Sequence, residues 1–150
     1  MLTAAFWNTN VRDNSLELAP FFTGWVSYTP QVDQGVSVNI AKTVNYAKYL
    51  RVGNLVIVQV NVTFTAGGTG GSGLSITLPS GLTPTNGLQI GNGMIYDASA
   101  STGYHASVYV VSGKMQFSGD WSGAGTWGFS PSLAIASGDN ITFNATYEKI

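Results

Sequence analysis

Apolar and polar residues alternate with a period of two through the middle of the chain. The clearest case is residues 55–65, where the apolar positions are Val56, Val58, Val60, Val62 and Phe64. From Gln59 onward the residues between them are all polar. This period places the apolar side chains on one face of an extended segment, so it predicts a half-buried β-strand.

Shorter segments of similar character predict strands at residues 25–32, 36–41, 46–52, 74–78, 87–96, 104–111, 114–119 and 141–149. The dipeptides Gly53-Asn54 and Ser112-Gly113 join two pairs of these segments and predict tight hairpins. Gly- or Pro-containing connections separate the remaining segments. Short strands with such turn signals predict an all-β fold, an antiparallel β-sandwich or barrel with a jelly roll as the leading topology.

The first 22 residues follow a different pattern. Thr3 can cap a short helix whose apolar stripe contains Trp7, Val11 and Leu18, and Pro20 would end it. Its many Asn, Asp, Ser and Thr residues compete for backbone hydrogen bonds, so this helix needs a partner surface to become ordered. We therefore divide the chain into an N-terminal docking arm at residues 1–22 and a β-sandwich domain at residues 23–150.

The composition narrows the range of partners. Charged residues make up only 9% of the 150 residues, and the six Lys and Arg are scattered, which argues against a nucleic-acid partner. No apolar run reaches the roughly 18 residues that span a bilayer, so we expect no membrane partner. Because charge is depleted at the core of protein interfaces, this composition favours a protomer of a larger assembly.

Candidate chemistry is sparse, and we expect no enzyme, no metal and no cofactor. The one histidine is His105, cysteine is absent, and no nucleophile-elbow motif accompanies the many serines. Asp97, Asp120 and Asp139 fall at strand ends or in loops but lack the spacing of a calcium-binding loop. Loop aspartates of this kind usually accept hydrogen bonds from nearby backbone N–H groups.

Trp121 and Trp127 flank a short Gly-rich connection. Aromatic rings displayed on a loop can stack on a sugar or anchor a protein partner, which makes both residues candidate binding groups. The alternative is that the two rings fill one end of the sandwich. The sequence leaves both interpretations open and favours the second.

Two parts of the chain resemble known proteins. Residues 2–14 contain Trp7-Asn8-Thr9-Asn10-Val11-Arg12-Asp13-Asn14 and resemble a stretch near the N-termini of virion structural proteins of tailed phages, particularly those that infect actinobacteria. Residues 25–30, 52–56 and 78–79 lie in a domain that looks like the β-sandwich modules of phage capsid decoration proteins and of tail or fibre tips. Such modules are commonly trimeric, so the resemblance implies a homotrimer.

The resemblance implies a protein on the surface of the virion that docks through its arm. The docking residues would be Phe6, Trp7, Asn8, Val11, Arg12, Asp13, Asn14 and Leu18. Without a coiled coil or β-helical repeat to form a fibre shaft, we expect a capsid decoration or minor capsid protein whose partner is the major capsid protein or another virion protein. The alternative is a tail-tip or fibre module that recognises a host-surface glycan.

Overall fold

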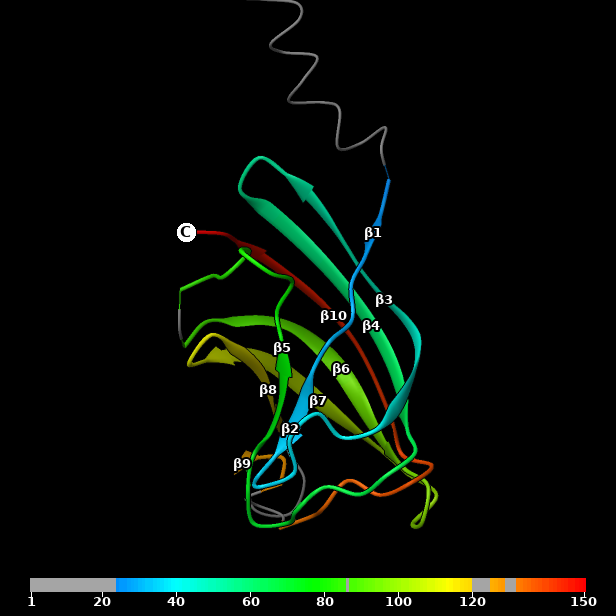
Figure 1. The fold of residues 1–150 in the computed structure, drawn as a ribbon. Helices are drawn as coiled ribbons and strands as arrows, with labels where there is room; N and C mark the ends of the chain where they lie inside the picture. Colours follow the sequence, from blue (N-terminus) through cyan, green and yellow to red (C-terminus); the bar gives the residue numbers. More distant parts are fainter. Residues whose placement is uncertain (1–23, 86, 120–124, 129–131) are drawn as a thin grey trace, which may run out of the picture.

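The computed structural model describes residues 24–85, 87–119, 125–128 and 132–150, and in this part the protein is all-β. The predicted helical arm, residues 1–22, lies outside the described residues. The strands, shown in Figure 1, are β1 (Val26–Ser27), β2 (Val32–Gln34), β3 (Lys42–Val52), β4 (Leu55–Phe64), β5 (Leu74–Thr77), β6 (Gln89–Asp97), β7 (Thr102–Val111), β8 (Lys114–Gly119), β9 (Gly125–Thr126) and β10 (Asn140–Glu148).

Both predicted tight hairpins are confirmed. The β3–β4 connection has a positive φ of 58° at Gly53, the first turn position, where glycine is favoured. The β7–β8 connection has positive φ at both Ser112 (50°) and Gly113 (72°), as a type I′ turn requires. These turns bring strands that are adjacent in sequence into antiparallel pairs.

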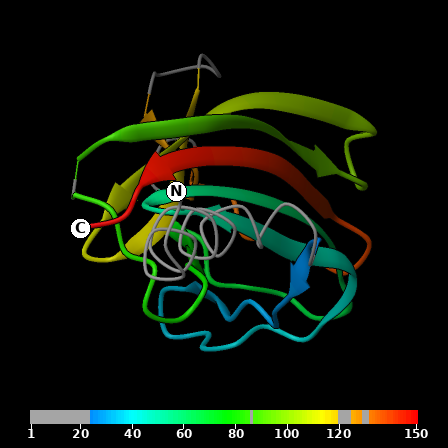
Figure 2. The same cartoon turned by 90° about the horizontal axis from the view of Figure 1, so that it is seen from above.

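The strands form one antiparallel sheet in the order β1-β3-β4-β10-β6-β7-β8-β5-β2, with β9 paired to β8. Its two outermost strands, β1 and β2, are consecutive in the chain. The five residue steps from Ser27 to Val32 can span at most about 18 Å. The sheet must therefore curl until its edges approach each other, and Figures 1 and 2 show the resulting half-barrel.

The core lies on the concave side of this curled sheet. The predicted inward face of β4 is confirmed, because Val56, Val58, Val60, Val62 and Phe64 are all buried. The inward residues of β7, β8 and β10 complete the core, and the rings of Phe117 and Phe143 meet edge to face with centroids 5.5 Å apart. Burial on one face of the sheet explains the period of two in the sequence.

The region between residues 25 and 41 differs from the prediction. The segment predicted as one strand at 25–32 contains only β1 and the first residue of β2, and these two strands lie at opposite edges of the sheet. Residues 36–41 do not form a strand. Gly35 (61°) and Asn39 (49°) have positive φ, and Val36 between them is 88% exposed. The turn backbone there is incompatible with a continuous ladder.

Two buried polar side chains hold β2 in place. Gln34 is fully buried, and its Nε2 donates to the Leu133 carbonyl oxygen at 2.8 Å while its Oε1 accepts from the Ile135 N–H at 2.9 Å. Asp33 accepts hydrogen bonds from the Asn39 N–H at 2.7 Å and from the Lys114 ammonium group at 2.7 Å. Side chains therefore supply the connections that a longer β2 would make through its backbone.

Candidate functional site

Trp127 belongs to the core. It follows β9, its N–H donates to the Phe117 carbonyl oxygen at 2.9 Å, and only 1% of its surface is exposed. Its ring packs against Tyr104 with centroids 5.0 Å apart. The interpretation of Trp127 as a ring that stacks on a glycan is therefore wrong, because burial in the core removes the ring from solvent. Trp121 lies outside the described residues.

The described chain begins at Gly24, close to the end of the sheet that carries the β3–β4 hairpin tip and the C-terminus (Figure 1). Val26, Leu55 and Ile150 are exposed apolar residues on the elements near this end. The Lys149 N–H donates to the Asn54 carbonyl oxygen at 2.8 Å, and the Ile150 N–H donates to that of Thr83 at 3.2 Å, so loops and C-terminus converge here. We call this region, defined by Val26, Leu55 and Ile150, the arm end.

The eight predicted docking residues all lie outside the described part of the chain. They are Phe6, Trp7, Asn8, Val11, Arg12, Asp13, Asn14 and Leu18. What the structure provides is the place at which the arm joins the domain, beside Trp25 and β1 (Figure 1). The docking role of these residues stays a prediction.

Two of the three aspartates considered as calcium ligands accept hydrogen bonds from backbone N–H groups. Asp139 accepts from the Ala98 N–H at 2.9 Å and from the Ala136 N–H at 2.8 Å. Asp97 accepts from Ser99 and Ala100, and these hydrogen bonds, opposed by slight burial, lower its pKa. Asp120 lies outside the described residues, among which no group of three or more His, Asp or Glu residues could hold a metal ion.

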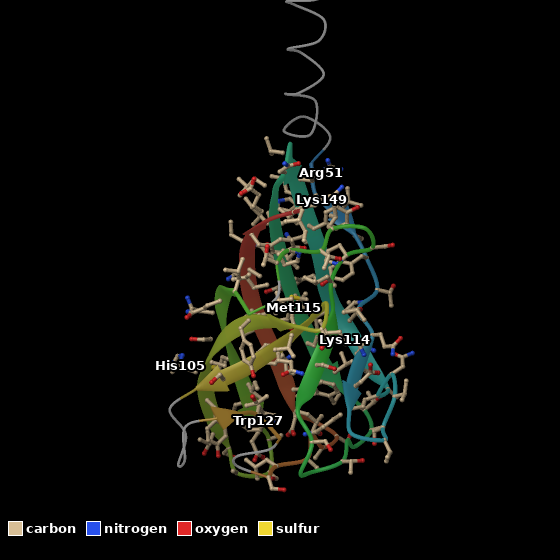
Figure 3. The ribbon with its side chains drawn as sticks, turned by 90° about the vertical axis from the view of Figure 1, so that its left-hand side faces the viewer. Arg51, His105, Lys114, Met115, Trp127 and Lys149 are labelled. Carbon is tan, nitrogen blue, oxygen red and sulfur yellow. The ribbon has the colours of Figure 1, made fainter. Side chains whose placement is uncertain are left out.

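His105 lies on the outer, solvent-facing side of β7 and projects from the edge of the domain in Figure 3. It borders a hollow of about 450 Å³ over β6, β7 and β8, lined by Asn92, Gly93, His105, Ala106, Ser107, Ser118 and Gly119. A second hollow of about 330 Å³ is lined by Gly87, Gln89, Ser107, Tyr109 and Ser118. Because Ser107 and Ser118 line both, the two hollows form one elongated depression, which we call the outer groove.

The register of the sheet aligns the polar side chains of the outer groove in a row. Asn92 lies opposite Ser107 on β7, and Ser107 lies opposite Ser118 on β8. On its other side Asn92 lies opposite Asn144 of β10, which does not line either hollow. Directly opposed residues on one face are close enough to act on the same bound group.

The hydrogen-bonding groups of this row are not engaged by the fold. Within the described residues, the side chains of Asn92, His105, Ser107 and Ser118 form no hydrogen bond. Elsewhere on the same face, by contrast, the Asn140 amide donates to Asn61 at 3.0 Å and to Thr63 at 3.1 Å, and Asn45 donates to the same two acceptors. The outer groove therefore differs from its surroundings in having free donors and acceptors.

Sequence reasoning missed the outer groove. The alternation in β6 and β7 does indicate that Asn92, His105 and Ser107 face outward. However, their alignment with Ser118 depends on the pairing register, which the sequence pattern does not specify.

No family model matches the sequence, and neither a curated protein nor a solved structure is significantly similar to it. No helix in the described part of the chain is long and apolar enough to cross a membrane.

Proposed function

We propose that this protein is a structural component of a tailed-phage particle, a capsid decoration or minor capsid protein on the virion surface. In this proposal residues 1–22 dock on the major capsid protein or another virion protein. The β domain, a jelly-roll-like sandwich module, is then displayed on the particle and reinforces it by adding buried contacts.

The observation that carries the proposal is the position of the arm junction. The arm joins the domain near the arm end, where Leu55 and Ile150 are 45% and 81% exposed. Exposed apolar side chains next to the junction can be covered by the same protein that the arm contacts. An arm that contains Phe6 and Trp7 and an apolar surface beside it can both contact one supporting protein.

We further propose that the chain is a homotrimer. The support is indirect: the resemblance to trimeric modules, the low content of charged residues, and the exposed apolar side chains of the arm end. Light scattering on the full-length protein should give three times the chain mass of 15.8 kDa. A monomer at concentrations well above those on a particle would contradict the trimer.

Deletion of residues 2–19 tests the docking role. The truncated protein should keep a β-rich circular dichroism spectrum and a cooperative thermal transition, because the described sheet contains no residue of that segment. It should no longer bind particles purified from a phage that lacks this gene, as measured by co-sedimentation. Electron cryomicroscopy of intact particles should place the protein on the head.

A pair of single substitutions separates the arm end from the rest of the surface. Leu55→Ser should weaken particle binding, because Leu55 belongs to the arm end. Val36→Ser is the control, since Val36 is in the turn after β2, at the opposite end of the domain (Figure 1).

Unchanged particle binding of the protein that lacks residues 2–19 would refute docking through the arm and leave the domain itself as the docking surface.

A tail-tip or fibre module that recognises a host glycan is the second candidate. Trp127 no longer supports it, because the ring is buried. The outer groove, a polar depression on the solvent-facing side of the sheet, is the observation that favours it.

A further inference from the structure

We propose that the outer groove is a binding site for a neutral oligosaccharide, that is, a glycan without carboxylate or phosphate groups. The site lies on β6, β7 and β8, and the buried Trp127 does not line it. The proposal goes beyond a structural role in the particle and does not depend on where the arm docks.

The charge of the outer groove defines the class of ligand. Among the residues that the structure describes, its lining contains no Asp, Glu, Lys or Arg. Recognition of an acidic sugar or a phosphate usually involves Arg or Lys. In the row that contains Asn92 the nearest Lys is Lys48, three strands away or about 14 Å. The Lys48 ammonium group lies over the Trp25 ring, 4.9 Å from the centroid, so it is not placed to bind an anion in the groove.

The free hydrogen-bonding groups match the chemistry of sugar hydroxyls. A sugar hydroxyl both donates and accepts, and so do the Asn92 amide and the hydroxyls of Ser107 and Ser118. The imidazole of His105 adds a further polar group at the border of the first hollow. Because these side chains form no hydrogen bonds with the described residues, a ligand can bind them without breaking contacts of the fold.

The shape of the outer groove fits a short chain of sugar rings. Ligand sites typically occupy about 300–1,000 Å³, and the two hollows of about 450 and 330 Å³ lie end to end. The row of Asn92, Ser107 and Ser118 crosses the groove where the two hollows meet, and the hollows extend from it in opposite directions along the strands. A short chain of sugar rings can therefore lie along the strands, with the row beneath one of its rings. Tyr109 lines the second hollow, and its ring offers an apolar surface for the C–H face of a sugar.

A second copy of the chain is a less suitable occupant. The cores of protein interfaces are packed as densely as protein interiors and are enriched in apolar side chains. The outer groove is hollow and polar, whereas the arm end carries the exposed apolar side chains of Val26, Leu55 and Ile150. These observations favour the arm end for contacts between copies and leave the outer groove open to a ligand.

The test uses the full-length protein on an array of neutral gluco-, manno-, galacto- and arabino-oligosaccharides, with sialylated and uronic-acid glycans for comparison. At least one neutral series should bind, and the acidic glycans should not. Asn92→Ala should weaken binding of that series about tenfold, the effect of one lost hydrogen bond.

Asn144→Ala is the matched control, because Asn144 lies opposite Asn92 on the same face but outside the outer groove. It should change the affinity by less than about twofold, well within the scatter of a surface substitution. Ser107→Tyr should abolish binding by filling both hollows. If that variant does not give the wild-type circular dichroism spectrum, Ser118→Tyr replaces it.

Three outcomes would overturn the proposal. The first is that no neutral glycan binds the folded wild-type protein at millimolar concentration. The second is that Asn92→Ala and Asn144→Ala weaken binding equally. The third is that Asn92→Ala changes the oligomeric mass measured by light scattering, which would make the outer groove a contact between copies.

Discussion

Asp33 on β2 and Lys114 on β8 form an ion pair of 2.7 Å although β5 lies between their strands. The Asp33 carboxylate also accepts from the Gln31 amide and the Asn39 N–H. Burial acts to raise the pKa of Asp33, but the hydrogen bonds and the charge of Lys114 outweigh it, and the pKa is lower than usual. The ionised form is therefore the one that the fold stabilises.

This shift predicts how stability depends on pH. A carboxyl group whose pKa is lower in the folded state stabilises the fold above its unfolded pKa, and the contribution is lost as the pH falls through the folded pKa. The melting temperature should therefore decrease as the pH is lowered below about 4, the ordinary range of an Asp side chain. Asp97, whose pKa is also lowered, should contribute in the same direction.

The variant Asp33→Asn isolates the contribution of Asp33 to the pH dependence of stability. This variant should be less stable at neutral pH by about 1–2 kcal/mol, since Lys114 is partly exposed and its charge is screened by solvent. Its melting temperature should depend less on acid pH than that of the wild type. If the melting temperatures of both proteins decrease equally as the pH falls, a group other than Asp33 causes the loss of stability in acid.

Truncation of Trp127 should destabilise the fold much more than truncation of Trp25. Trp127→Ala should reduce the free energy of unfolding by about 3–5 kcal/mol, because it leaves a cavity in the core. Trp25 is 39% exposed and contacts Lys48, so Trp25→Ala should cost no more than about 1 kcal/mol. Urea titration followed by circular dichroism measures both. Equal losses would mean that the Trp127 ring does not support the core.

Gln34 is the side chain on which the attachment of β2 most depends. Gln34→Leu should destabilise the fold by about 2–4 kcal/mol, because it leaves the Leu133 carbonyl and the Ile135 N–H buried without partners. Gln59→Leu, on the outer face of β4, is the control and should cost less than about 0.5 kcal/mol. Comparable unfolding midpoints for the two variants would contradict this role of Gln34.

The sequence pattern identified the strands whose two faces have different environments. The alternation of β4 was interpretable because one face is in the core and the other in solvent. The hairpin turns were interpretable because glycine marks positions with positive φ. Residues 36–41 show the limit: Val36, Val38 and Ile40 alternate as in a strand, yet Val36 and Val38 are exposed in a turn.

The tertiary features could not be predicted in the same way. Neither the outer groove nor the Asp33–Lys114 pair arises from one segment, since both depend on which strands become neighbours and in what register. Trp127 shows a related difficulty: a tryptophan beside a Gly-rich connection has the same local sequence whether its ring is displayed or buried. The burial of Trp127 is decided by tertiary contacts, namely the pairing of its backbone with Phe117 and the packing of its ring against Tyr104.

The short outer strands have a consequence for the behaviour of many copies at close quarters. An exposed sheet edge can add a strand from another molecule and so start a fibre. Here β1 and β2 are only two and three residues long, and the part of β3 beyond β1 contains a bulge between Val44 and Tyr46. A bulge and a short edge both interrupt the regular array of N–H and C=O groups that an incoming strand needs. The domain can thus be crowded on a surface without its sheets joining edge to edge, and a change that lengthened β1 along β3 would remove that protection.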